Sequence, residues 1–128
     1  MGDLEYRILG PVEVWRDGVN TRMRVSALTD SHQILIFEQF CDPGHGAPMH
    51  IHAVEEVLEV MKGKAEIFLG EESRIVTADQ SVVIPAGARH GFKNIGSGIL
   101  KVRATMAASI FEATYDSRSE LSRRYSPS

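Results

Sequence analysis

The stretch CDPGHGAPMHIHAVEEVLEVMKG, residues 41–63, places three of the chain's five histidines within eight residues and two glutamates soon after them. On a strand, His50 and His52 would face the same way with Cα atoms roughly 6.5–7 Å apart. Two imidazoles at that spacing can bind one ion through bonds of about 2.0–2.1 Å. On a helix they would lie about 200° apart, and Pro43 and Pro48 also disfavour a helix start. The pattern therefore predicts a strand whose histidines can chelate a metal.

Glu56 and His90 are the other candidate ligands. Glu56 has the same strand parity as His52, but on one straight strand it would lie about 13 Å further along. The chain must therefore bend at residues 53–55, so that Glu56 starts the neighbouring strand and points back toward the histidines. Glu55 should then point the other way and have a structural role. His90 comes 38 residues after His52, and spacing alone does not place it.

The rest of the chain is composed mainly of short segments rich in Val, Ile, Phe and Thr, with Gly and Pro between them. No long helical period is present. In GILKVRATMA, residues 98–107, apolar and polar side chains alternate, which predicts a half-buried strand. Evenly spaced short strands indicate an antiparallel sandwich or barrel. The end of the chain, SRSELSRRYSPS at 117–128, differs in composition and is predicted to be a short helical or disordered tail.

The bulk composition is that of an ordinary globular protein. The chain has 128 residues, of which 43% are hydrophobic and 24% charged, and this length suits a single domain. A net charge of −3 argues against a nucleic-acid partner. No apolar run approaches the ~20 residues that span a bilayer, and the first residues show no signal-peptide pattern. Cys41, the single cysteine, is expected to be a packed thiol, and the expected location is the cytoplasm.

The histidine-rich stretch resembles the first motif of the cupin family position by position. The matching residues are Gly44, His50, His52, Glu56 and Gly63. The second cupin motif is similar to PAGARHGFKN, through Pro85, Gly87, His90 and Asn94. Where the family usually has a glycine six residues before this proline, the chain has Asp79. Aspartate tolerates the left-handed backbone of a turn, so the departure concerns turn geometry and not the site.

The resemblance implies an all-β fold, an antiparallel double-stranded β-helix or jelly-roll barrel of the small single-domain, metal-binding type. The barrel would occupy residues 1–116, with the first motif at 44–63 and the second at 79–94. It also implies one divalent transition metal per chain, Fe, Mn, Ni, Co or Zn, since this mixture of nitrogen and oxygen ligands does not choose among them. The implied metal ligands are His50, His52, Glu56 and His90.

For function, the resemblance favours a metal-dependent enzyme of dioxygenase, isomerase, lyase or decarboxylase type acting on a small oxygenated molecule. The alternative is a non-catalytic module that binds or senses a small ligand. The candidate substrate contacts are Arg89, Phe92 and Arg103. No catalytic residue is assigned, and His32 and His45 are expected to be solvated.

Two features of the flanking segments carry further expectations. The three tyrosines are Tyr6, Tyr115 and Tyr125, so a mechanism that needs a phenol beside the metal must take it from an end of the chain. The strand at residues 57–61 is apolar on both faces apart from Glu59. A strand covered on both sides suggests a second sheet or a second subunit over it, and we expect a homodimer.

Overall fold

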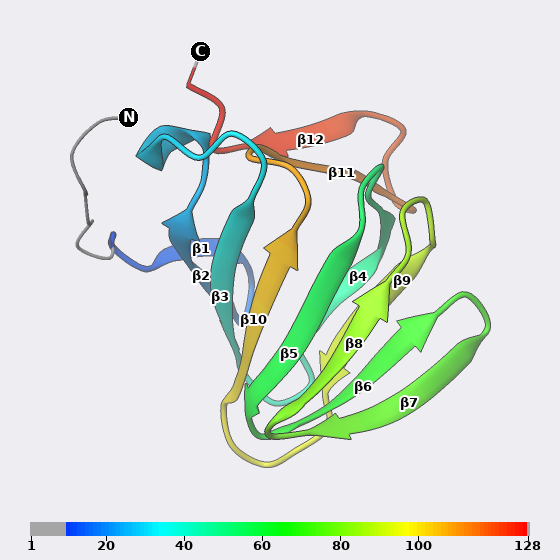
Figure 1. Ribbon diagram of the computed structural model, residues 1–128. Coiled ribbons are helices and arrows are strands. Elements are labelled where there is room, and N and C mark those ends of the chain that lie inside the picture. Colours follow the sequence, from blue (N-terminus) through cyan, green and yellow to red (C-terminus); the bar gives the residue numbers. More distant parts are fainter. Residues whose placement is uncertain (1–9, 128) are drawn as a thin grey trace.

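The computed structural model describes residues 10–127, which form two six-stranded antiparallel sheets (Figure 1). The strands of the first sheet, in spatial order, are β1 (Glu13–Arg16), β2 (Val19–Val25), β3 (Leu35–Cys41), β10 (Leu100–Met106), β5 (Glu56–Lys62) and β8 (Gln80–Ile84). Those of the second sheet are β12 (Leu121–Arg124), β11 (Phe111–Tyr115), β4 (Gly46–Ile51), β9 (His90–Asn94), β6 (Lys64–Leu69) and β7 (Glu72–Thr77). The predicted all-β jelly roll is confirmed.

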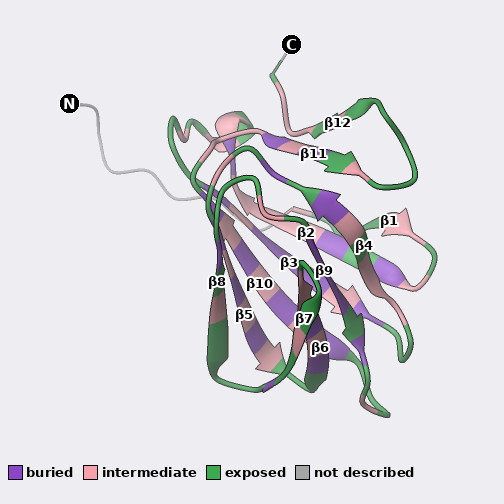
Figure 2. Ribbon diagram, turned by 90° about the vertical axis from the view of Figure 1, so that its right-hand side faces the viewer, coloured by how far each residue is buried: buried purple, intermediate pink, exposed green. Residues whose placement is uncertain are grey.

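Strand β10 shows how the sequence pattern builds the core between the sheets. Its side chains alternate between buried and half-buried along the whole strand, as the period of two requires. The buried set includes Leu100 and Val102, and the half-exposed set includes Lys101 and Arg103. Figure 2 shows the same striping on neighbouring strands. Burying one face of each sheet against the other supplies most of the driving force for folding.

The first motif crosses from one sheet to the other. Strand β4 ends at Ile51 in the second sheet, and β5 begins at Glu56 in the first. The predicted bend at residues 53–55 is thus confirmed, although β5 lies in the opposite sheet and does not pair with β4. Glu55 is exposed while Glu56 is buried, as the change of direction requires. The crossing lets ligands from both sheets meet in the barrel interior.

Asp79 occupies the turn before β8 in a left-handed conformation, with φ of 70°. Its backbone N–H donates to the carbonyl of Val60 at 2.9 Å, which closes the turn against β5. The expectation that aspartate would serve here in place of glycine is therefore confirmed.

The C-terminal segment differs from its prediction. Residues Leu121–Arg124 form β12, which pairs antiparallel with β11, so the expectation of a helical or disordered tail is wrong there. The edge of β11 offers a full ladder of backbone partners, which overrides a weak local helix preference. The segment is also anchored by side chains: the Arg124 guanidinium lies 4.2 Å from the Trp15 ring, and the Tyr125 hydroxyl donates to Glu13.

Two further expectations concern residues that the structure does not describe. Tyr6 and the start of the predicted 1–116 domain lie outside residues 10–127. Within those residues, no helix is long and apolar enough to cross a membrane.

Gly46 begins β4 where its backbone packs closely on β9. A Cβ at this position would lie 2.1 Å from the carbonyl oxygen of Phe92, so the two strands would have to separate. We expect Gly46→Ala to lower the free energy of unfolding by about 2 kcal/mol or more, measured as a shifted urea midpoint. Gly98→Ala is the matched control, because no atom lies within 4 Å of its Cβ position. Equal midpoints for the two variants would contradict the close approach.

Candidate metal centre

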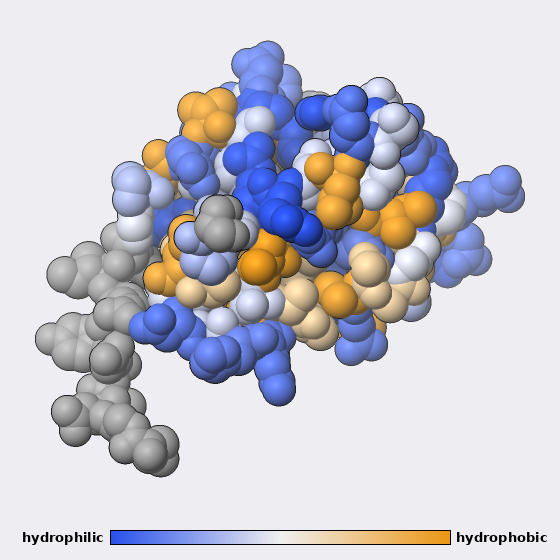
Figure 3. All heavy atoms as spheres, turned by 90° about the horizontal axis from the view of Figure 1, so that it is seen from above, coloured by the Kyte–Doolittle hydropathy of each residue, from blue (hydrophilic) through white to orange (hydrophobic). Residues whose placement is uncertain are grey.

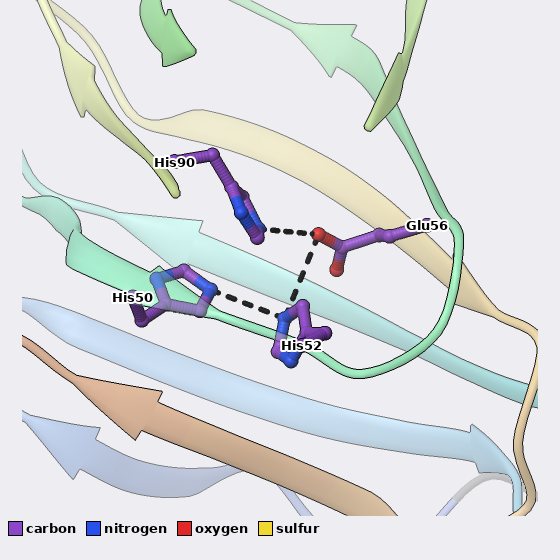
Figure 4. Close-up of side chains that lie close together, drawn as sticks. All are labelled: His50, His52, Glu56 and His90. Carbon is purple, nitrogen blue, oxygen red and sulfur yellow. Dashed lines mark hydrogen bonds and ion pairs between the residues drawn. The ribbon is translucent and has the colours of Figure 1, made fainter. Parts of the chain in front are cut away.

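Four buried side chains from both sheets converge inside the barrel (Figure 4). His50 lies in β4 and His52 just after it, Glu56 begins β5, and His90 begins β9. All four side chains are at most 5% exposed, and one ligand atom from each lies within 4.8 Å of all the others. The structure therefore brings together all four residues that the sequence analysis selected as metal ligands, including His90, whose position spacing could not give.

The distances between the ligand atoms suit a shared ion. The Nε2 atoms of His50 and His52 are 3.1 Å apart, and His90 Nε2 lies 2.9 Å from Glu56 Oε1. His52 Nε2 lies 3.6 Å from the same oxygen. Two donors at right angles on an ion with bonds of about 2.0–2.1 Å are separated by about 3 Å. The cluster is thus already spaced for a common ion.

The backbone sets the tautomer of each histidine. His50 Nδ1 donates to the carbonyl of Pro48 at 2.6 Å, and His90 Nδ1 donates to that of Ala88 at 2.8 Å. His52 Nδ1 donates to the carbonyl of Glu112 at 2.8 Å. Because a carbonyl only accepts, each Nδ1 carries the hydrogen and each Nε2 presents its lone pair to the cluster. Such outer hydrogen bonds orient imidazoles in metal sites.

The resulting cluster is rich in hydrogen-bond acceptors. The three Nε2 atoms and the Glu56 carboxylate face one another, and among the described side chains their polar contacts lie within the cluster. Buried acceptors crowded together are costly. One divalent cation would satisfy all four groups at once, so the residues present fit the metal that the cupin resemblance implies.

The electrostatic surroundings keep the imidazoles of His50 and His52 neutral. Burial, together with the neighbouring His90 and His52, lowers the pKa of His50 to about 3, while the bond to the Pro48 carbonyl acts in the opposite direction. Burial also lowers the pKa of His52, against the opposing effect of the Glu56 carboxylate. Neutral imidazole is the form that ligates a metal. His50 and His52 are therefore in their binding form at neutral pH.

The four ligands open onto a small chamber with a volume of about 20 Å³. This is close to the space that one water molecule needs. Its walls include Phe92, one of the predicted substrate contacts, together with Phe37 and Phe111. These apolar walls exclude bulk water from the cluster, and the chamber has no room for the body of an organic substrate.

Two other predicted substrate contacts lie outside this chamber. Arg89 is half exposed and donates to Asp116, with Nε 2.8 Å from Oδ2. Arg103 donates to Glu59 from Nη2 at 2.7 Å, on the face of β10 turned away from the core. Each guanidinium already has a carboxylate partner, and neither lines the chamber. A substrate role for these arginines remains a prediction.

Arg16 and Tyr115 line the mouth of the chamber. The Arg16 guanidinium donates to the Tyr115 hydroxyl from Nη2 at 3.1 Å and to the Gly46 carbonyl from Nη1 at 3.2 Å. The ring centroids of Tyr115 and His50 are 5.2 Å apart. The sequence analysis required any phenol near the site to come from a chain end, and Tyr115 is such a residue. The sequence offered no signal for Arg16. This residue reaches the site because β1 pairs with β2 at the edge of the sheet.

Comparison with known families agrees with the fold and the motifs. A family model described as a cupin domain matches residues 37–107, which is more than half of the chain. The chain belongs to the cupin family.

Two curated proteins resemble part of the chain. Mannose-1-phosphate guanylyltransferase 2 of Escherichia coli O157:H7 is 39% identical over 56 residues, which cover 42% of this chain and 11% of that protein. The polyketide synthase CurC of Streptomyces cyaneus is 38% identical over 55 residues, covering 42% of this chain and 36% of the other. The match thus spans about a tenth and about a third of these relatives' lengths.

Solved structures share the fold at low sequence identity. An oxalate decarboxylase from Lactobacillus farciminis, in a formate complex, has a TM-score of 0.74 at 18% identity over 83% of this chain and 33% of that one. KdgF from Halomonas sp. has a TM-score of 0.67 at 16% identity, over 77% and 88%. An RmlC-like cupin from Shewanella frigidimarina has a TM-score of 0.64 at 21% identity, over 77% and 84%. At these identities the likeness shows the fold alone.

Proposed function

We propose that this protein is an enzyme that depends on one divalent transition metal and acts on a small oxygenated molecule. The observation that carries the proposal is the convergence of three imidazole Nε2 atoms and the Glu56 carboxylate in a buried chamber, with each imidazole oriented by a backbone carbonyl. The metal would be Fe, Mn, Ni, Co or Zn, held by His50, His52, Glu56 and His90. When bound, such an ion polarises an oxygen of the substrate or, if it is redox-active, supports O₂ chemistry.

The residues around the ligands would bind, orient and protect the substrate. Phe37, Phe92 and Phe111 would exclude water from the chamber. The Tyr115 hydroxyl accepts its hydrogen bond from Arg16, so its own hydrogen can be donated to a substrate oxygen at the mouth. Tyr115 is therefore our candidate for holding or moving a proton, since no other described tyrosine lines the chamber.

The reaction type remains open among dioxygenase, isomerase, lyase and decarboxylase. Solved structures with the same fold include an oxalate oxidase in complex with glycolate and oxalate decarboxylases. Oxalate is a small oxygenated molecule, which is the substrate class proposed here. One curated relative is named as a polyketide synthase, and polyketides are also rich in oxygen. These names support the class of substrate and no single compound.

The test is a turnover screen on protein of known metal content. Wild type reloaded with Fe²⁺, Mn²⁺, Co²⁺, Ni²⁺ or Zn²⁺ is offered small diketones, phenols and thiols, with O₂ uptake and substrate loss measured. We expect at least one metal form to consume a candidate and His90→Ala to consume none. Substrate loss that is equal in the two proteins would show that the cluster is not the site of reaction.

The alternative is a non-catalytic module that binds or senses a small ligand. The chamber volume of about 20 Å³ favours this alternative, because so small a space admits a metal and little else. Ligand binding that depends on the metal, without consumption of any candidate in any metal form, would support the module over the enzyme.

We also propose that the protein is a homodimer in the cytoplasm, with residues 1–116 as one domain. The outward side chains of β5 are the half-buried Val57, Glu59 and Met61, so two apolar side chains flank the glutamate that pairs with Arg103. Sedimentation at micromolar concentration should give about twice the 14.2 kDa mass of one chain. A mass near 14.2 kDa would refute the dimer.

A further inference from the structure

We propose that a pocket beside the metal centre binds an organic carboxylate, with Arg16 as its charge partner and the Tyr115 hydroxyl as a second hydrogen-bond donor. This inference rests on the proposed function in one respect, because the bound molecule would be the substrate that the metal centre acts on. It names the chemical class of that substrate.

The pocket has a volume of about 250 Å³, enough for a small organic molecule. The residues that line it are Trp15, Arg16, Pro48, Tyr115, Ser117, Arg118, Ser122 and Arg124. Trp15, Arg16 and Tyr115 also line the metal chamber, so these three side chains stand between the two spaces. Because the chamber holds little more than an ion, the body of a substrate must lie in the outer pocket and reach inward past them.

The charge of the pocket selects the class of ligand. Three of its described lining residues are arginines, and none of those described residues is acidic. Arg118 is paired with Glu120, and the Arg124 guanidinium lies over the Trp15 ring. Arg16 differs from Arg118, because the bonds it makes in the described structure are to two neutral oxygens, those of Gly46 and Tyr115. A half-buried guanidinium that has no carboxylate partner among residues 10–127 favours an anion.

The shape of the pocket favours an organic acid over a bare inorganic anion. The guanidinium of Arg16 is planar and matches the geometry of a carboxylate. Beside it, the Trp15 ring and Pro48 supply apolar surface for the carbon skeleton, and Ser117 and Ser122 add hydroxyls. Arg16 is held in place by the carbonyl of Gly46, so its position is set before the ligand arrives. Preorganisation of this kind lowers the cost of binding.

The face that carries β11 and β12 is mixed in character. Figure 3 views the molecule from this end and shows hydrophilic side chains beside apolar ones. Elsewhere the two arginines of the sequence prediction are neutralised, Arg89 by Asp116 and Arg103 by Glu59. Arg16 is therefore a better candidate for contact with a charged substrate than the two arginines named in the sequence analysis.

The test compares benzoate with benzamide, which has the same ring and shape but no charge. Trp15 is the chain's only tryptophan and lines the pocket, so its fluorescence reports binding directly. We expect wild type to bind benzoate at least about tenfold more tightly than benzamide, since a hydrogen bond to a charged group contributes roughly tenfold to a hundredfold. This comparison needs no variant. Equal binding of the two probes, or no binding of either, would overturn the proposal.

Variants then assign the preference to Arg16. Arg16→Gln should bind benzoate and benzamide alike, and Arg16→Lys should retain part of the preference. Arg74→Gln is the matched control, because it removes the same charge from an exposed position on β7 that lines neither the metal chamber nor the outer pocket. We expect it to keep the full preference. An undiminished preference in Arg16→Gln, or an equal loss in Arg74→Gln, would overturn the assignment.

Metal content measured on the same samples separates this inference from the proposed function. If wild type prefers benzoate but binds no metal, the anion pocket is supported and the metal enzyme is contradicted. If wild type binds metal but binds the two probes equally, the metal centre is supported and the anion pocket is overturned.

Discussion

Replacing His52 with alanine is expected to abolish most metal binding while the barrel stays folded. His52 is 2% exposed, and its Nε2 lies within hydrogen-bond range of His50 Nε2 and 3.6 Å from Glu56 Oε1. Loss of an outer hydrogen-bond partner alone costs roughly 10–100-fold in metal affinity, so loss of a direct ligand should cost more. The measurement is competition for Zn²⁺ against a chromophoric chelator, with thermal melting as the check on folding.

His45→Ala is the control for this experiment. His45 lies in the same stretch of sequence, but it does not belong to the cluster and does not line the metal chamber. Its removal should leave the metal affinity unchanged. Full metal occupancy in His52→Ala, or in His90→Ala, would show that the ligands have been wrongly assigned.

Acid should destabilise the metal-free protein strongly. The pKa of folded His50 is lowered from 6.5 to about 3 by burial and by the neighbouring histidines. At pH values above the pKa of His50 in the unfolded chain, this imidazole is neutral in both the folded and the unfolded state, so the full stability is present. As the pH falls from 6.5 toward 3, the unfolded chain takes up a proton that the folded chain refuses, and stability is lost. We expect His50 to cost about 2–3 kcal/mol by about pH 4.5, with His52 acting in the same direction.

Urea unfolding of chelator-treated protein across this pH range measures the effect. His50→Gln removes the titrating ring, so the fall in stability below pH 6.5 should be shallower in that variant. Adding metal at neutral pH should raise the stability of wild type by mass action, and acid should reverse the gain as protons displace the ion. Stability that stays flat from about pH 7 to 4.5, with no response to chelators, would contradict a buried metal-binding cluster.

The sequence predicted an antiparallel sandwich or barrel and the chelating pair His50 and His52 because both depend on short-range patterns. Alternation of apolar and polar side chains gives the faces of β10, and the proline and glycine positions separate the strands. The spacing of His50 and His52 requires only that β4 be extended. The placement of His90 beside Glu56 came from the cupin motif, because it depends on two strands in different sheets.

The features that the sequence did not predict depend on contacts between distant segments. The hydrogen bond from Arg16 to Tyr115 joins residues 99 positions apart in the chain, and no local pattern predicts it. Arg89 and Arg103 were candidate substrate contacts, yet each pairs with a carboxylate in the folded chain. The strand at Leu121–Arg124 forms because β11 presents an edge to pair with, which a composition-based prediction of a tail cannot include.

The central claim is that His50, His52, Glu56 and His90 hold one divalent metal. The most direct measurement is an anomalous difference map from a crystal grown with Zn²⁺ or Mn²⁺. We predict one strong peak per chain among these four side chains, at bonding distance from the three Nε2 atoms and a Glu56 oxygen. A cluster without a peak, while the metal binds at His32, His45 or another surface site, would contradict the account.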